Sequence, residues 1–331
     1  MNFVDSISSG NRLALSRLIT EVENETSTGK AVLDECFTRS GKAHLIGVTG
    51  APGTGKSSLV NRIAQLVRRE GAKTVAVVAI DPSSPFTGGA ILGDRVRMRD
   101  LAGDPGVFIR SMASRGELGG LSRTTAGVVQ LLDAAGYDLI LIETVGAGQS
   151  EVDIARLAHT TIVVESPGMG DDIQAIKAGI LEIADILVIN KADRPGIENT
   201  ERALRANLEL GYNQRVNGKA GHGGFSETSP KEESEGWIPP VVKTIATEET
   251  GVPEVIKAIE DHKGYLLETG LYRQRERERL LDEFQHLLRH ALVENWKNDC
   301  PAERVDRIME EVFNRKRSPG SAVEELIKKD I

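Results

Sequence analysis

The chain has 331 residues, a formal net charge of −8 and 40% hydrophobic residues, so it can bury a substantial core. The negative charge and the low aromatic content of 4% argue against non-specific binding to nucleic acid. No apolar run approaches the roughly 20 residues that span a bilayer, no signal-peptide pattern opens the chain, and the two cysteines lie far apart; we therefore expect a soluble cytoplasmic protein with reduced thiols and no membrane partner.

Residues 1–40 are expected to form a helical extension, in which Leu13, Leu15, Leu18 and Ile19 lie roughly on one face. Residues 41–267 then alternate short apolar runs with helical runs. The expected strands are 43–50, 74–81, 138–144, 160–166, 185–193 and 239–246, and the expected helices are 55–70, 121–136, about 172–183 and 252–266. This alternation predicts an α/β fold with a mostly parallel central sheet flanked by helices, whose functional site lies beyond the carboxyl ends of the strands.

Two segments depart from this alternation. Residues 213–237 are polar and are expected to form a mobile loop between the last two strands. Residues 268–331 are charged and are expected to form a helical arm. One side of this arm carries an apolar stripe: Leu280, Phe284, Leu287, Leu288, Ala291 and Leu292. Such a stripe must pack either on the core or on a second copy of the chain.

GAPGTGKS, residues 50–57, matches the P-loop pattern G-x-x-x-x-G-K-[ST] between an expected strand and an expected helix. In a P-loop, backbone N–H groups surround phosphate oxygens and the helix N-terminus favours their negative charge. We expect Lys56 to reach the β- and γ-phosphates and the Ser57 hydroxyl to ligate Mg²⁺. The expected phosphate-binding residues are Gly50, Ala51, Pro52, Gly53, Thr54, Gly55, Lys56, Ser57 and Ser58.

DPSSPFTGGAILGDRVRM, residues 81–98, begins where the second expected strand ends, close to the predicted phosphate site. Asp81 and Asp94 are candidates for Mg²⁺ ligation or for positioning the attacking water. Arg95 and Arg97 are candidates for phosphate contact or for ion pairs that set a switch position. We interpret the segment as a switch that senses the γ-phosphate, and the alternative is a solvated surface loop.

Two further polar segments follow expected strands. In ETVGAGQSE, residues 143–151, Glu143 is expected to hold Mg²⁺ directly or through water, and the Gly146 N–H to sense the γ-phosphate. In PGMGDDIQAIKAGILE, residues 167–182, helical spacing places Asp171, Gln174 and Lys177 on one polar face. Spacing alone favours an ordinary helix start for this second segment.

NKAD, residues 190–193, ends the expected strand 185–193 and predicts guanine recognition. Asp193 can accept from guanine N1–H and the exocyclic amine, Asn190 can meet the other edge of the ring, and Lys191 can pack on the base or the P-loop. Adenine would leave the aspartate unpaired, at about 1–3 kcal/mol or more. Ala246, after the last strand, can offer its N–H to guanine O6. We therefore expect GTP and GDP as ligands and GTP hydrolysis as the activity, with Lys56, Asp81, Asp94 and Glu143 as catalytic candidates.

Together these motifs resemble the MeaB/ArgK family of methylmalonyl-CoA mutase-associated GTPases, within the SIMIBI class of P-loop GTPases, which contains the signal-recognition and metal-insertion GTPases. Segments 81–98 and 167–182 carry the resemblance more specifically than the P-loop. The resemblance implies a homodimer built through the C-terminal helices. It also implies a chaperone role, in which GTP turnover gates adenosylcobalamin delivery to a B12-dependent acyl-CoA mutase and protects that enzyme. Asp171, Gln174 and Lys177 would then contact the mutase.

The sequence also departs from the family pattern and leaves competing functions open. Ile245-Ala246 stands where the family often has Ser-Ala, and the chain has no DxHxxG motif to ligate cobalamin through histidine. The alternatives are a transport-linked kinase or ATPase, a metal-insertion GTPase and a nucleotide-dependent scaffold. NKAD argues against the first, and distant cysteines with six scattered histidines argue against the second.

Overall fold

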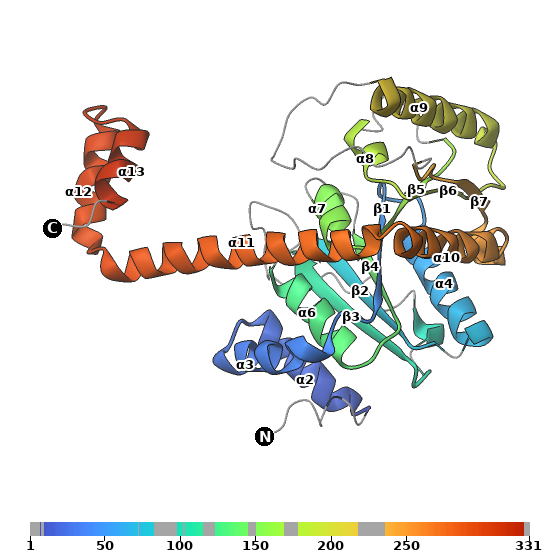
Figure 1. Cartoon of the computed structure of the whole chain (residues 1–331), viewed down its shortest axis with the longest axis horizontal. Helices are drawn as coiled ribbons and strands as arrows, with labels where there is room; N and C mark the ends of the chain where they lie inside the picture. Colours follow the sequence, from blue (N-terminus) through green and yellow to red (C-terminus); the bar gives the residue numbers. More distant parts are fainter. Residues whose placement is uncertain are drawn as a thin grey trace. The chain divides into compact units, whose positions relative to one another are not determined.

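The computed structural model describes residue 7 and residues 10–71, 73–82, 98–101, 103–114, 123–144, 150–168, 178–217 and 236–327. Within them, seven strands form one sheet in the order β3-β2-β4-β1-β5-β6-β7, and every neighbouring pair is parallel (Figure 1). The strands are β1 (His44–Thr49), β2 (Val75–Pro82), β3 (Val107–Ser114), β4 (Leu139–Thr144), β5 (Thr160–Glu165), β6 (Ile186–Asn190) and β7 (Val241–Thr244). The predicted α/β fold with a parallel sheet is confirmed.

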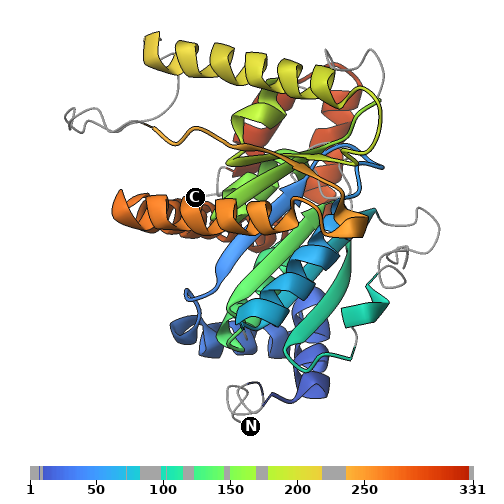
Figure 2. The same ribbon diagram turned by 90° about the vertical axis from the view of Figure 1, so that its right-hand side faces the viewer.

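Helices lie on both faces of this sheet (Figures 1 and 2). On one face pack α4 (Lys56–Gly71) and α10 (Val252–Glu268). On the other face lie α6 (Arg123–Ala134) and α7 (Ser150–Leu157), with α2 (Arg12–Glu23) and α3 (Ser27–Cys36) packed against α6, and with α8 (Ala178–Glu182) and α9 (Ile197–Asn217) beside β5 and β6. Alternate residues of a strand face opposite sides, so Ile46 and Val48 pack towards α4 whereas Leu45 packs towards α6.

Strand β3 and helices α7 and α9 were not predicted. Strand β3 lies at the sheet edge, and Arg110 and Ser111 interrupt its apolar run, so it lacks the continuous pattern of a central strand. Helix α9 extends to Asn217, so the prediction of a loop is wrong for residues 213–217, and residues 218–235 lie outside the described part.

The N-terminal helices have a slightly different apolar face from the predicted one. In α2 the buried side chains are Leu15, Ile19 and Val22, whereas Leu13 is 62% exposed. Helix α2 begins at the cap residue Asn11, whose side chain accepts from the Ala14 N–H at 3.0 Å. This cap fixes the start of the helix and with it the set of residues that face α6.

Residue contacts divide the chain into two units, residues 1–276 and 277–331. Helix α11 (Leu271–Asp299) begins in the first unit and continues into the second, where α12 (Ala302–Phe313) and α13 (Pro319–Ile327) follow. In the second unit, the Trp296 indole N–H donates to the Leu326 carbonyl at 3.0 Å, and Arg304 donates to the Glu325 carbonyl at 3.0 Å. No helix of the described residues is both long and apolar enough to span a membrane.

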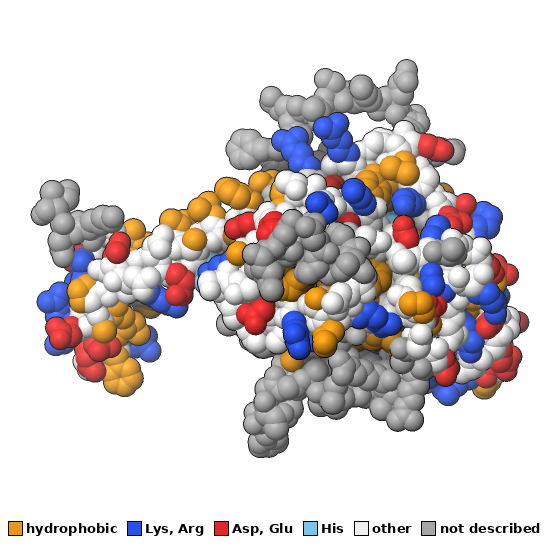
Figure 3. Space-filling view, turned by 90° about the horizontal axis from the view of Figure 1, so that it is seen from below, with side chains coloured by type: hydrophobic (Ala, Val, Ile, Leu, Met, Phe, Trp, Pro, Cys, Tyr) orange, Lys and Arg blue, Asp and Glu red, His pale blue; other side chains and the backbone are white. Residues whose placement is uncertain are grey.

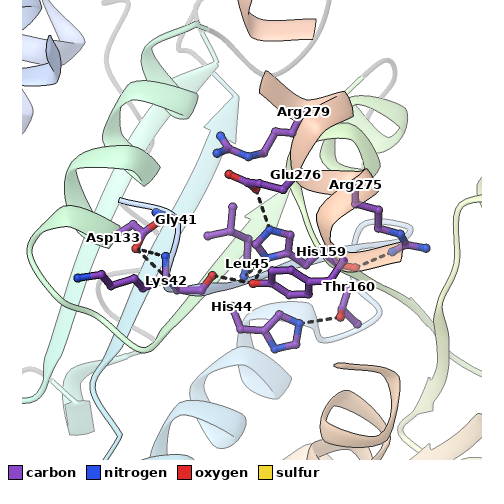
Figure 4. Close-up of polar contacts among 12 residues, drawn as sticks. Gly41, Lys42, His44, Leu45, Asp133, His159, Thr160, Arg275, Glu276 and Arg279 are labelled. Carbon is purple, nitrogen blue, oxygen red and sulfur yellow. Dashed lines mark hydrogen bonds and ion pairs between the residues drawn. The ribbon is translucent and has the colours of Figure 1, made fainter. Parts of the chain in front are cut away.

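A buried polar network joins the amino ends of β1, β5 and β6 to α10 and the first turns of α11, and Figure 4 shows its part around His44, His159, Thr160 and Arg275. We call it the amino-edge network; its members are His44, His159, Thr160, Asp185, His262 and Arg275. The Thr160 hydroxyl lies 2.9 Å from both His44 Nε2 and His262 Nδ1, and Arg275 binds both carboxylate oxygens of Asp185 at 2.8 and 2.9 Å. The network thus anchors α11 at the sheet edge opposite the P-loop.

Burial shifts the pKa values of this network. Desolvation, helped by the nearby His159, lowers the pKa of His44 to about 2. Burial alone would raise the pKa of Asp185, but hydrogen bonds from Arg275 and His262 outweigh it and lower that pKa to about 2. Both groups bind protons more readily in the unfolded chain, so each lowers the free energy of unfolding as the pH falls. The effect of His44 begins below about pH 6.5 and that of Asp185 below about pH 4.

We predict that His44→Gln flattens the acid side of the stability profile. Wild-type stability should decline below pH 6.5 partly because His44 takes up a proton on unfolding. One such proton gives the unfolding free energy a slope of up to about 1.4 kcal/mol per pH unit. Glutamine keeps hydrogen-bonding atoms but has no such proton. Urea midpoints between pH 7.5 and 5 measure the slope. His286→Gln, at an exposed position of α11, is the matched control; equal slopes in wild type and His44→Gln would contradict the prediction.

Candidate functional site

The loop of residues 50–55 connects β1 to α4 at the carboxyl edge of the sheet, and glycines make its path possible. Gly50, Gly53 and Gly55 have φ values of 135°, 82° and 95°, in the region that favours glycine. A Cβ on Gly50 would lie 2.1 Å from the Val164 carbonyl oxygen, and one on Gly55 would lie 2.3 Å from Asn190 Nδ2. The P-loop therefore needs glycine at these two positions for space as well as for conformation.

Lys56 and Ser57 open α4 beneath this loop, and both are buried. Lys56 Nζ donates to the carbonyls of Gly50 at 2.9 Å and Ala51 at 3.0 Å, so the ammonium group lies within the curve of the loop. A cation held there, at a helix N-terminus, suits the charge of bound phosphates.

The Ser57 hydroxyl donates to Glu143 Oε1 at 2.6 Å, and Glu143 is itself buried at the carboxyl end of β4. Register explains why they meet: Glu143 pairs with Val48 of β1 on one side and with Ala79 of β2 on the other. Two hard oxygen donors, a hydroxyl and a carboxylate, fit the preference of Mg²⁺.

Asn190 joins the P-loop to the loop that follows β7. Its Nδ2 donates to the Thr54 carbonyl at 2.9 Å, and its Oδ1 accepts from Thr244 Oγ1 and from the Ala246 N–H, each at 3.1 Å. The side chain is 2% exposed, so these contacts satisfy buried polar groups. Asn190 therefore holds the P-loop, the end of β7 and the loop after β7 together at one point.

The other NKAD residues surround that point. Lys191 has a φ of 60° and donates from Nζ to the Gly53 carbonyl at 2.6 Å, so it also holds the P-loop. The Ala192 N–H donates to the Thr244 carbonyl at 3.0 Å, while Asp193 is exposed. The two segments that the sequence assigned to phosphate and to base thus lie together in the structure.

Several predicted site residues cannot be placed. Asp81 belongs to β2, but its side chain is not described. The remaining ones lie outside the described residues: Asp94, Arg95, Arg97, Gly146, Asp171, Gln174 and Lys177. Sequence reasoning missed Thr244, which binds Asn190, because no local pattern marks a threonine 54 positions away as its partner.

Comparison with known proteins decides the family. Residues 15–300 match the family described as "Methylmalonyl Co-A mutase-associated GTPase MeaB". The chain belongs to the MeaB family. It is therefore a GTPase, and it binds GTP.

Individual relatives support the assignment of this chain to the MeaB family. A Pyrococcus horikoshii protein, provisionally named a GTPase, is 42% identical over 326 residues, which are 98% of this chain and 96% of that protein. GTPase ArgK of Escherichia coli is 39% identical over 269 residues, 80% of this chain and 76% of its own length. The crystal structure of a LAO/AO transport system kinase has a TM-score of 0.67 at 26% identity, covering 98% of this chain and 95% of its own. The fold thus extends along nearly the whole chain.

Proposed function

We propose that this GTPase gates the delivery of adenosylcobalamin to a B12-dependent acyl-CoA mutase and protects that enzyme from inactivation. The supporting observation is the match of residues 15–300 to a family described as mutase-associated. Methylmalonyl-CoA mutase or a close relative is the proposed client. Within the chain, segment 167–182 would carry the contact with the mutase through Asp171, Gln174 and Lys177, and Arg95 and Arg97 would act in the switch that precedes it.

In the proposed GTP complex, the P-loop holds the phosphates and Lys56 balances their charge. Ser57 and Glu143, whose oxygens lie 2.6 Å apart, would hold Mg²⁺, with Asp81 and Asp94 as further candidates. The metal would neutralise negative charge on the β- and γ-phosphates. Asp193 would read the guanine N1–H and amine, and the Ala246 N–H would meet O6. Asn190 and Lys191 would keep the base and phosphate sides of the site in register through their contacts with Thr54 and Gly53.

We also propose that the arm pairs two copies of the chain. No residue of α11 is buried within the single chain, although hydrophobic side chains run along it (Figure 3). Among them, Phe284 is 60% exposed, Leu288 45% and Leu292 59%. Large apolar side chains in a continuous row usually mark an interface, and a second α11 offers the matching stripe.

A transport-linked kinase is the second candidate, because the similar crystal structure is that of a LAO/AO transport system kinase. The guanine-type motif at the end of β6 favours the GTPase interpretation. A metal-insertion GTPase gains no support from the described residues, which contain no group of three or more His, Cys, Asp or Glu placed to hold a metal.

The test is GTP hydrolysis by the purified chain, with and without the adenosylcobalamin-dependent mutase of the same organism and with the γ-phosphate labelled. We predict severalfold faster release of inorganic phosphate when the mutase is present. Unchanged hydrolysis with intact GTP binding would refute the mutase proposal and leave the GTPase assignment standing. Label transferred to protein instead of released as phosphate would favour the kinase. A mutase variant that does not bind cobalamin is the control for non-specific stimulation.

A further inference from the structure

The loop after β7 has an unusual anchor. It comprises the short 3₁₀ helix η4 (Ala246–Glu248) with its flanking residues Ile245 and Glu249, and we call it the β7 loop, residues 245–249. Among the strands that the structure describes, β7 is at the edge of the sheet and pairs with β6 alone, so the sheet constrains this loop on one side. The Ala246 N–H donates to Asn190 Oδ1, which ties the beginning of the loop.

Arg62 of α4 binds the remainder of the β7 loop. The guanidinium donates from Nε to the Ala246 carbonyl at 3.3 Å, from NH2 to the Thr247 carbonyl at 3.4 Å, and from NH1 to Glu249 Oε1 at 2.9 Å. One planar cation thus contacts both ends of the β7 loop. Its side chain is 27% exposed and that of Glu249 is 33% exposed, so the pair is partly shielded from water.

Glu249 shows that the loop is held under constraint. Its φ of 62° lies in the left-handed region, which is unfavourable for residues other than glycine. Its carboxylate is bound by two arginines of α4, Arg62 at 2.9 Å and Arg69 at 3.0 Å. Such a conformation persists where the surroundings determine it, and here the surroundings are the face of α4.

The same helix carries the phosphate side of the site. Lys56 and Ser57 are the first residues of α4, and Arg62 follows Lys56 by six positions. A single helix of 16 residues therefore presents the phosphate-binding lysine at its start and, less than two turns later, the cation that holds the β7 loop. The spacing between phosphates and base is then fixed by one rigid element.

We propose that Arg62 is a positioning residue for guanine recognition: it holds the β7 loop so that the Ala246 N–H faces O6 of the base. This inference rests on the proposed contact between Ala246 and guanine. At present the N–H donates to Asn190, so the contact with guanine requires only a change or sharing of the acceptor. Without Arg62 the Ala246 and Thr247 carbonyls lose this partner and Glu249 keeps Arg69, so the loop is held by the Asn190 contact and by the backbone bridge between Ile245 and Thr250, and the direction of the Ala246 N–H is less closely fixed.

The test compares the affinities of two nucleotides for two proteins. GDP and 6-thio-GDP are each titrated calorimetrically into wild type and into Arg62→Ala. Sulfur accepts hydrogen bonds weakly, so 6-thio-GDP weakens the contact that the Ala246 N–H would make at position 6. We expect wild type to prefer GDP by about tenfold, and Arg62→Ala to lose most of that preference by weakening GDP alone. Arg62→Lys keeps the charge but cannot span both carbonyls, so it should show a smaller loss of the same kind and serves if Arg62→Ala is unstable.

Arg68→Ala is the matched control. Arg68 lies on the same helix and forms an ion pair of similar burial with Asp104, but its guanidinium bonds Asp104 and the Lys73 carbonyl and not the β7 loop. Its removal should leave the preference unchanged. A wild-type preference that Arg62→Ala retains, or equal weakening of both ligands, would overturn the role of Arg62 alone. Absence of any preference in wild type would instead remove the proposed Ala246 contact and, with it, this inference.

Discussion

Replacing Lys56 with alanine is expected to weaken GTP binding by two to three orders of magnitude. Lys56 is 6% exposed and its ammonium group lies within the P-loop, where it already meets the carbonyls of Gly50 and Ala51. Bound phosphates would face a loop that has lost its one cation among residues 50–57. Removing one partner of a buried, hydrogen-bonded charge pair costs about 3–4 kcal/mol, which corresponds to that loss of affinity.

Calorimetric titration of GTP measures the effect. Lys73→Ala is the matched control, because Lys73 follows the far end of α4 and forms an exposed ion pair with Glu260 at 3.1 Å. It removes the same charge from the chain and should leave GTP affinity within about twofold. Thermal unfolding of both variants checks that the fold is intact. Wild-type affinity in a folded Lys56→Ala protein would refute the assignment of residues 50–57 as the phosphate site.

The sequence located those parts of the candidate site whose signal is local. A glycine-rich run between an apolar strand and a helix is visible in eight consecutive residues, and the structure places GAPGTGKS between β1 and α4. The central strands could be predicted equally well, because burial on both faces makes their sequences continuously apolar. Edge strand β3 was missed, since its polar Arg110 and Ser111 break that signal.

Contacts between residues far apart in the chain could not be predicted from the sequence. The roles of Asn190 and Arg62 depend on which loops meet at the carboxyl edge, and these contacts join residues 136 and 184 positions apart. The amino-edge network has the same character: His44, His159 and His262 look like scattered histidines until the parallel sheet brings the starts of β1 and β5 beside α10. The order of the strands in the sheet determines which of these residues are neighbours, and sequence patterning predicts the fold class but not that order.

Replacing Asp193 with asparagine is expected to lower GTP affinity about a hundredfold and to admit xanthine nucleotide. The carboxylate would accept two hydrogen bonds from guanine, each worth about 1.5–3 kcal/mol to a charged group. The asparagine amide places a donor opposite those donors, whereas xanthine presents a carbonyl at that position. Asp193 is exposed and its loop is fixed by Lys191 and Ala192, so the substitution should change the chemistry of the side chain and leave its position unchanged.

Competitive titrations with GTP and XTP measure this exchange of preference. Glu198→Gln removes an exposed carboxylate from the first turn of α9 and should alter neither affinity, which separates base reading from a change of net charge. Unchanged GTP and XTP affinities in Asp193→Asn would refute the base-reading role.

Combining Asp193→Asn with Lys56→Ala tests how separate the base and phosphate sides are. If they act independently, Lys56→Ala lowers XTP affinity in the Asp193→Asn background by the same factor as it lowers GTP affinity in wild type. Two bridges join the sides, from Asn190 Nδ2 to the Thr54 carbonyl and from Lys191 Nζ to the Gly53 carbonyl. We therefore expect Lys56→Ala to lower XTP affinity in the Asp193→Asn background by a smaller factor than it lowers GTP affinity in wild type, because a P-loop loosened by one change has less order left for the other to remove.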